Sequence, residues 1–141
     1  MILGIDHVGL VTEDPAGVGQ FMAALGMNTA EQGLVEAYGV SCEFWQYSQD
    51  PREPAVELVA PVRHDAAVVD YLCRNGPGLY HIAFEVDNLE DEMTRLRGNG
   101  VVPVDSEPRE GARPGMRVAF MYLPKPAGLL IELVRYAKRR R

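Results

Sequence analysis

The sequence predicts an α+β fold in which two tandem βαβββ modules form one cupped mixed sheet. Three observations predict it: strand and helix patterns occur twice in the same order, matching residues recur at a nearly constant offset, and the chain is short. Its 141 residues can bury one sizeable core but cannot make two independent domains. We therefore expect a single domain over 1–141, with module one at about 1–62, a linking helix at 63–76, module two at about 77–136 and a basic tail at 137–141.

The first module begins with a strand pattern over Ile2–Thr12. Asp14 and Pro15 then supply a helix N-cap and a proline at the first helical position. Apolar residues recur at helical spacing from Val18 to Leu25, and Gly26 ends the helix. Three strand patterns complete the module, a weaker one near Met27–Val35 and clearer ones at Val40–Tyr47 and Ala55–Ala60.

The second module repeats this order after a linking helix over His64–Asn75. A strand fits Leu79–Val86, and Asp87 or Asn88 can cap the next helix. That helix presents apolar residues at helical spacing, and two glycines close it. Three strands are then expected at Val101–Val104, Met116–Leu123 and Leu129–Val134.

The two halves also match residue by residue. An offset of 74 places His7 on His81, and an offset of 76 places Phe44 on Phe120. An offset of 75 superposes the segment VELV on IELV, so that Glu57 meets Glu132. Small differences in loop length would produce this drift, which indicates a duplicated module.

Each module therefore carries one histidine on its first strand and one glutamate on its last strand. Both glutamates lie among aliphatic residues, where burying an unpaired carboxylate is costly. If the modules pair about a pseudo-twofold axis, four side chains converge on one point, and His81 faces a metal-lined cavity while its neighbours face away. Two imidazoles and two carboxylates suit one divalent ion such as Zn²⁺, Mn²⁺, Co²⁺, Ni²⁺ or Fe²⁺, and the absence of thiolates argues against a closed structural zinc site. The predicted ligands are His7, Glu57, His81 and Glu132.

Composition excludes several classes of function. The net charge of −6 argues against a nucleic-acid partner, because phosphate contacts need a basic surface. No apolar run reaches the roughly 18 residues of a membrane span. The N-terminal segment lacks the pattern of a signal peptide, so we expect a cytoplasmic protein in which Cys42 and Cys73 are reduced.

Five segments carry a resemblance to a known family: IDHVGL (5–10), VELVAP (56–61), GLYHIAFEV (78–86), EPREGARPGMRVAF (107–120) and LPKPAGLLIEL (123–133). In their order and spacing the chain resembles the vicinal oxygen chelate superfamily of glyoxalases, extradiol dioxygenases and bleomycin-resistance proteins. Within it, the chain is most similar to the methylmalonyl-CoA epimerases. The resemblance covers about residues 3–136 and implies a cupped sheet, a homodimer, and a metal on the four residues named above.

The resemblance also implies an activity. In the epimerases a metal holds the oxygens of a 2-substituted malonyl-CoA, and two bases move the proton on C2. Removing a proton next to a thioester creates an enolate, whose charge a divalent ion can stabilise by several kcal/mol. The last-strand glutamate, Glu132, is implied as one base.

The second base is less well determined by the resemblance. Aligning the turn YGV (38–40) places Cys42 at that position with Glu43 one residue away, whereas aligning EQGLVEA (31–37) selects Glu36. A β-bulge would bring Glu43 to the site, and we predict Glu43 as the second base. A missing second base would favour another isomerase or lyase reaction over epimerisation.

Further departures and alternatives stay open. The epimerases usually have His-His where this chain has Tyr80-His81, and strand alternation predicts that Tyr80 points away from the metal. Arg109, Arg113 and Lys125 could meet carboxylate or phosphate oxygens, or could lie in ordinary solvated turns. The alternative functions are a glyoxalase-like isomerase or lyase that tailors a secondary metabolite, and a drug-binding resistance protein.

Overall fold

The computed structural model describes residues 1–138 and confirms the α+β fold with a mixed sheet. Residues 139–141 of the predicted tail at 137–141 lie outside the described residues. Strands and helices follow one another in the expected order, and among the described residues only the short β7 was not predicted. The elements are β1 Ile2–Val11, α1 Pro15–Ala24, β2 Asn28–Val35, β3 Val40–Gln46, β4 Ala55–Pro61, α2 Ala67–Asn75, β5 Gly78–Val86, α3 Leu89–Gly98, β6 Val102–Pro103, β7 Arg109–Glu110, β8 Met116–Leu123 and β9 Leu129–Tyr136.

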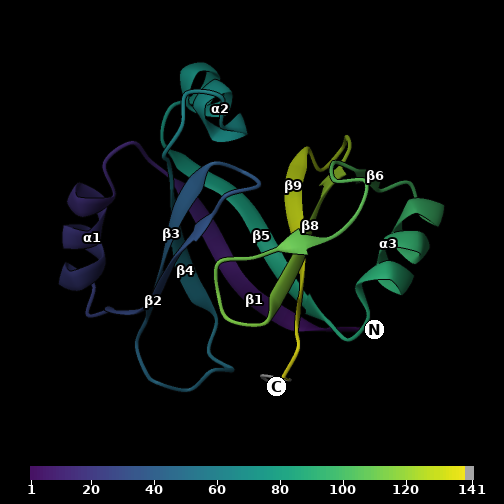
Figure 1. Cartoon of the computed structure of the whole chain (residues 1–141), viewed down its shortest axis with the longest axis horizontal. Coiled ribbons are helices and arrows are strands. Elements are labelled where there is room, and N and C mark those ends of the chain that lie inside the picture. The colour runs from purple at the N-terminus through teal and green to yellow at the C-terminus, as the bar shows by residue number, and fades with distance from the viewer. Residues whose placement is uncertain (139–141) are drawn as a thin grey trace.

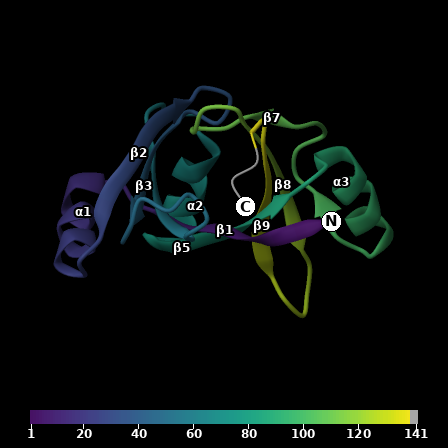
Figure 2. The same ribbon diagram turned by 90° about the horizontal axis from the view of Figure 1, so that it is seen from below.

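Nine strands of the described chain form a single sheet in the order β2-β3-β4-β1-β5-β9-β8-β6, and β7 pairs with β8. The first strands of the two halves, β1 and β5, pair antiparallel at its centre. Each also pairs parallel with the last long strand of its own half, β1 with β4 and β5 with β9. The sheet curves so that its halves rise on either side of β1 and β5 (Figures 1 and 2).

The helices cover the two ends of this sheet, with α1 and α3 on opposite sides of the molecule (Figure 1). Helix α1 packs through Met22 in a cluster that includes Leu58 and Trp45, so Trp45 is a packing residue. Helix α3 packs through Leu89 and Met93 on the second half. Helix α2 joins the cluster inside the first half. No helix within 1–138 is long and apolar enough to cross a bilayer.

Three register shifts interrupt the central pairing of β1 with β5, and two of them lie beside the predicted ligands His7 and His81. Ile5 pairs with Phe84 and His7 pairs with Ala83, which leaves Asp6 as an extra residue in β1. A second register shift leaves Tyr80 as an extra residue in β5, immediately before His81. A bulge disturbs the alternation of side chains. Asp6 is therefore buried beside His7, and Tyr80 lines a cavity beside His81. The prediction that Tyr80 points away was wrong for this reason.

Candidate metal centre and active-site cavity

Two rows of paired residues across the sheet bring the four predicted metal ligands together. In one row, Gly9 of β1 lies between Glu57 of β4 and His81 of β5. In the other, Ala83 of β5 lies between His7 of β1 and Glu132 of β9. Gly9 and Ala83 have small side chains, so the longer side chains beside them can meet over the centre of the sheet.

All four side chains are buried, and their ligand atoms are close. His7 Nε2 lies 3.1 Å from His81 Nε2, 3.3 Å from Glu57 Oε1 and 3.0 Å from Glu132 Oε1. His81 Nε2 lies 3.3 Å from Glu57 Oε1 and 3.6 Å from Glu132 Oε1. The ligand atoms of His7, His81 and Glu132 all lie within 4.8 Å of one another.

The chemistry of these donors fits a cation. His7 Nδ1 lies 2.7 Å from Asp6 Oδ2, and a carboxylate at this distance accepts the Nδ1 proton. In the neutral ring the lone pair of Nε2 then points at carboxylate oxygens, which are acceptors too. Glu132 Oε1 is buried, and the imidazole Nε2 atoms of His7 and His81 face it at 3.0 and 3.6 Å. Such a group of facing acceptors is satisfied by a divalent ion or by added protons.

The charges of this group shift one another's protonation. Burial alone would lower the pKa of His7, but the charge of Glu57 and hydrogen bonds to the surrounding carboxylates outweigh it and raise that pKa well above its usual range. Burial likewise opposes the rise in the pKa of His81, which its bonds to Glu132 and Glu57 produce. For Glu57, burial is outweighed by the charges and hydrogen bonds of the imidazoles, which hold its pKa well below the ordinary value. Without a metal, the site therefore retains protons on its imidazoles.

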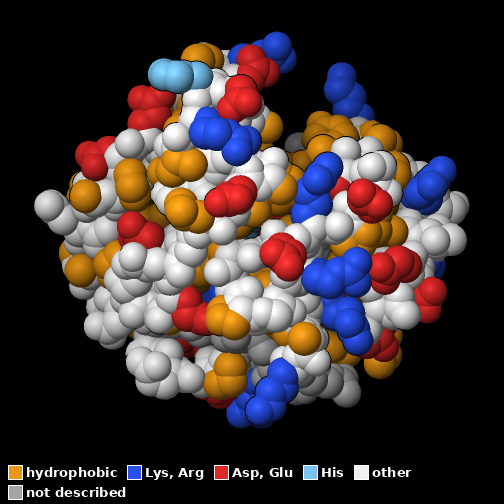
Figure 3. Space-filling view, viewed as in Figure 1, with side chains coloured by type: hydrophobic (Ala, Val, Ile, Leu, Met, Phe, Trp, Pro, Cys, Tyr) orange, Lys and Arg blue, Asp and Glu red, His pale blue; other side chains and the backbone are white. Residues whose placement is uncertain are grey.

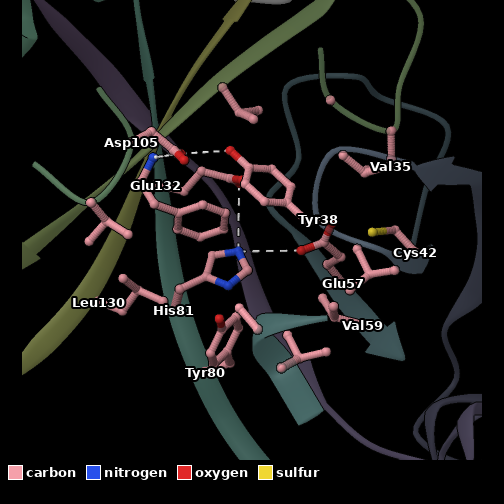
Figure 4. Close-up of a pocket in the computed structure, with 18 of the residues that line it drawn as sticks. Val35, Tyr38, Cys42, Glu57, Val59, Tyr80, His81, Asp105, Leu130 and Glu132 are labelled. Carbon is pink, nitrogen blue, oxygen red and sulfur yellow. Dashed lines mark hydrogen bonds and ion pairs between the residues drawn. The ribbon is translucent and has the colours of Figure 1, made fainter. Parts of the chain in front are cut away.

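A cavity of about 210 Å³ adjoins the four ligands, three of which line it. Figure 4 shows Glu57, His81 and Glu132 on its wall, with Tyr38 and Asp105 above the imidazole of His81 in this view. Most of the other lining side chains are apolar and come from β3, β4, β8 and α2. Figure 3 shows a notch bordered by hydrophobic side chains between the parts of the surface over α2 and over β9. The apolar walls leave a substrate few polar partners besides the metal ligands.

The structure does not bring the predicted second base to the cavity. Glu43 lies in a regular part of β3 with no bulge, and its carboxylate accepts a hydrogen bond from Trp45 Nε1 at 3.2 Å. Glu36 is exposed after β2. Cys42 faces the cavity instead, and burial together with the nearby charge of Glu57 raises the pKa of its thiol well above its ordinary value.

The candidate anion-binding residues also differ from one another. Arg113 is buried and ion-paired with Asp6 and Glu31, at 3.4 and 3.0 Å. Arg109 Nε lies 3.8 Å from Asp105 Oδ1, and Lys125 is exposed in the β8–β9 turn. Arg113 is thus part of the protein interior and not of a solvated turn.

Sequence reasoning missed three polar residues around the site: Asp6, Tyr38 and Asp105. Tyr38 donates a hydrogen bond to Asp105 Oδ2 at 2.6 Å, which also accepts the Phe120 backbone N–H at 2.8 Å. Tyr38 and Asp105 belong to different halves, so no local pattern joins them. The one signal in the sequence was that Asp6 directly precedes His7. Strand alternation places neighbouring side chains on opposite faces, so this signal points to the site only if a β-bulge is assumed.

A profile of the glyoxalase/bleomycin resistance protein/dioxygenase superfamily matches residues 6–120. The chain belongs to this superfamily, as its resemblance indicated.

Among individual proteins, the uncharacterized protein YqjC of Bacillus subtilis is 31% identical over 92% of this chain and 89% of its own length. The mitochondrial methylmalonyl-CoA epimerase of Homo sapiens is 27% identical over 92% of this chain and 72% of its own length. A solved structure of a variant Streptomyces coelicolor methylmalonyl-CoA epimerase in complex with 2-nitronate-propionyl-CoA has a TM-score of 0.86 at 30% identity, covering 98% of this chain and all of that chain. Relatives and structural neighbours of the chain therefore include methylmalonyl-CoA epimerases.

Proposed function

We propose that this chain is a divalent-metal-dependent epimerase that moves the C2 proton of a 2-substituted malonyl-CoA or a similar carbonyl acid. The observation that carries the proposal is the convergence of two imidazoles and two carboxylates beside an apolar cavity that three of them line. The similarity to methylmalonyl-CoA epimerases, one of them in complex with an acyl-CoA analogue, supports the substrate class.

In this proposal the cation is held by His7, Glu57, His81 and Glu132. The chemistry that a divalent ion supplies there, when bound, is stabilisation of the negative charge of an enolate. Co²⁺, Mn²⁺, Ni²⁺, Zn²⁺ and Fe²⁺ all match this set of nitrogen and oxygen donors. The homodimer and the cytoplasmic location stay predictions from the sequence.

Glu132 is the proposed base. Its carboxylate lies on the cavity wall, with Oε1 3.0 Å from His7 Nε2. A carboxylate within reach of C2 can take the proton and hold it while the enolate exists. The apolar side chains around it exclude water, which reduces loss of that proton to solvent.

The placement of Glu43 favours a second candidate reaction. Epimerisation through two bases needs a proton carrier on each face of the enolate, and neither Glu43 nor Glu36 lines the cavity. Cys42, whose thiol burial keeps protonated, occupies the predicted position. A metal-dependent isomerase or lyase needs only one carboxylate base and is compatible with this arrangement.

Exchange of the C2 proton in D₂O distinguishes the two reactions. Metal-loaded protein would be incubated with one epimer of methylmalonyl-CoA, and C2 deuteration and configuration would be followed by NMR and chiral chromatography. Deuterium with inversion is expected for the epimerase. Deuterium with retention would support a one-base reaction, whereas no exchange by protein shown to contain metal would overturn the epimerase and favour an isomerase or lyase that acts on another metabolite.

A further inference from the structure

A buried hydrogen-bond network joins the loop between β7 and β8 to His7. Asp6 Oδ2 lies 2.7 Å from His7 Nδ1, accepts from the Tyr136 hydroxyl at 2.9 Å and lies 3.4 Å from Arg113 Nη1. Tyr136 also bonds Arg113 Nη1, at 2.9 Å. Asp6 and Arg113 are only 4% and 3% exposed. One carboxylate oxygen thus connects an imidazole, a phenol and a guanidinium.

Contacts with the first half hold Arg113 in this network, although the residue belongs to the second half. Its guanidinium lies over the ring of Phe44, 3.9 Å from the ring centroid, and its Nε lies 3.0 Å from Glu31 Oε1. The loop approaches β2 closely at Gly33, where a Cβ would collide with the Ala112 carbonyl oxygen. Arg113 is therefore fixed between the two halves before any substrate enters.

The two histidines of the candidate metal centre are held unequally. His81 is 2% exposed, yet its Nδ1 has no hydrogen-bond partner among the described residues. At the position that corresponds to Asp6, the second half has Tyr80, whose ring packs edge-on against His81 with centroids 5.4 Å apart. Of the two Nδ1 atoms, only that of His7 has a carboxylate partner among the described residues.

We propose that Asp6, Arg113 and Tyr136 are positioning residues that prepare His7 to bind the divalent ion. By accepting the Nδ1 proton, Asp6 leaves Nε2 free to coordinate and fixes the orientation of the ring. Arg113 and Tyr136 hold the Asp6 carboxylate in place through their contacts with its Oδ2 atom. The affinity for the metal then depends on Arg113, in the β7–β8 loop of the second half, although His7, the ligand that this network positions, belongs to the first half. This inference rests on the metal centre of the proposed function.

Titration with Co²⁺ tests the inference without measuring activity. Metal-free protein would be titrated while the visible Co²⁺ spectrum is recorded, and the apparent Kd would be compared among variants. Removing such a partner of a ligand histidine typically weakens metal binding by about 10- to 100-fold. We expect this loss for Asp6→Leu, a similar loss for Arg113→Met and a smaller loss for Tyr136→Phe, with a changed Co²⁺ spectrum in each. Asp6→Asn, which keeps an acceptor oxygen, should retain more affinity than Asp6→Leu.

Glu92→Gln is the matched control. Glu92 is also a buried carboxylate paired with an arginine, since its oxygen lies 2.7 Å from Arg95 Nη2, but it belongs to α3 and contacts no histidine. Glu92→Gln should bind Co²⁺ as wild type does, even if it lowers the unfolding temperature. This separates a general loss of stability from a specific loss at the metal.

The outcomes also separate this inference from the proposed function. Wild-type Co²⁺ affinity and an unchanged spectrum in folded Asp6→Leu and Arg113→Met would overturn the inference and leave the proposed function standing. Failure of the wild-type protein to bind Co²⁺ would overturn both. If Asp6→Leu does not fold, Tyr136→Phe decides, because it removes a single hydroxyl: unchanged binding would overturn the inference.

Discussion

Gly9 and Ala83 lie beneath the candidate metal centre, and their small size leaves space for the ligand side chains. The His81 ring lies directly against Gly9, and an ideal Cβ there would be 2.8 Å from Nε2 and closer still to other ring atoms. Ala83 has the equivalent position in the second half and is fully buried. The structure thus requires glycine at position 9, beside His81 Nδ1, the ring nitrogen that has no hydrogen-bond partner among the described residues.

Gly9→Ala should displace the His81 ring and weaken Co²⁺ binding at least about 10-fold, the scale on which disturbed ligand geometry costs affinity. The fold should survive, because the obstacle is a side chain and not backbone. Co²⁺ titration measures the affinity, and circular dichroism measures whether the variant keeps the wild-type fold. Gly98→Ala is the control, since nothing lies within 4 Å of its added methyl group. Equal affinities in the two variants would contradict the prediction.

Exchange of the C2 proton should depend on Glu132 and not on Glu43. Glu132→Gln removes the proposed base, and we expect the exchange rate to fall by about 100-fold or more. Glu43→Gln should change the rate less than about threefold, because its carboxylate bonds Trp45 outside the cavity. Rates at saturating metal, measured by NMR, provide the comparison. A large loss in Glu43→Gln would show that β3 rearranges when substrate binds.

The sequence could reveal four of the residues at the centre because duplication repeats them. His7 and Glu57 have counterparts in His81 and Glu132, and the structure brings all four together. Asp6 has no such counterpart, and its position depends on a bulge that alternation cannot predict. Glu43 was assigned to the site by assuming a bulge that β3 lacks. Register irregularities therefore limit what can be predicted at single residues.

At the scale of elements, local signals define the helices that pack outside the sheet. Asp14 and Asn88 each precede a helix, and their side chains accept the backbone N–H of Gly17 and Asp91, both at 3.0 Å. The long strands also lie where hydrophobic patterns predict them. The linking helix begins at Ala67 and not at His64, because its N-terminus has no side-chain cap and the preceding residues form a turn. Strand β7 was missed because two residues carry no periodic pattern.

Asn88→Ala should lower the free energy of unfolding by about 1 kcal/mol, the usual cost of losing an N-cap side chain. Urea denaturation of the metal-free protein measures the difference. Asn88→Asp keeps an acceptor oxygen and places a negative charge at the start of α3, so its stability should equal or exceed that of wild type. If the alanine and aspartate variants were equally destabilised, the cap would not be the cause.

At the scale of the whole molecule, the buried histidines and carboxylates of the site make the stability of the fold depend on pH. The pKa values of His7 and His81 are raised above 6.5, so their bound protons stabilise the folded state below pH 6.5 and this contribution is lost as pH rises through the raised values. The pKa values of Asp6 and Glu57 are lowered from 3.8 and 4.5, so their contribution is present above those values and is lost in acid. Metal-free protein should thus be most stable between these limits.

Thermal unfolding from pH 5 to pH 9 tests this expectation in two samples. With chelator present, the Tm should fall as pH rises above 6.5. With excess Co²⁺ it should instead hold or rise, because the cation replaces protons on the ligands and binds more tightly as they leave. Parallel pH profiles in the two samples would contradict a metal centre at these residues.

The duplicated plan has a consequence for ancestry. A solitary βαβββ unit would offer a divalent ion one imidazole and one carboxylate, too few to retain it. A precursor of that size could have held a cation only by meeting a second copy of itself. Joining two such copies through α2 makes their association independent of concentration, and it lets one half carry a residue such as Asp6 that the other does not have.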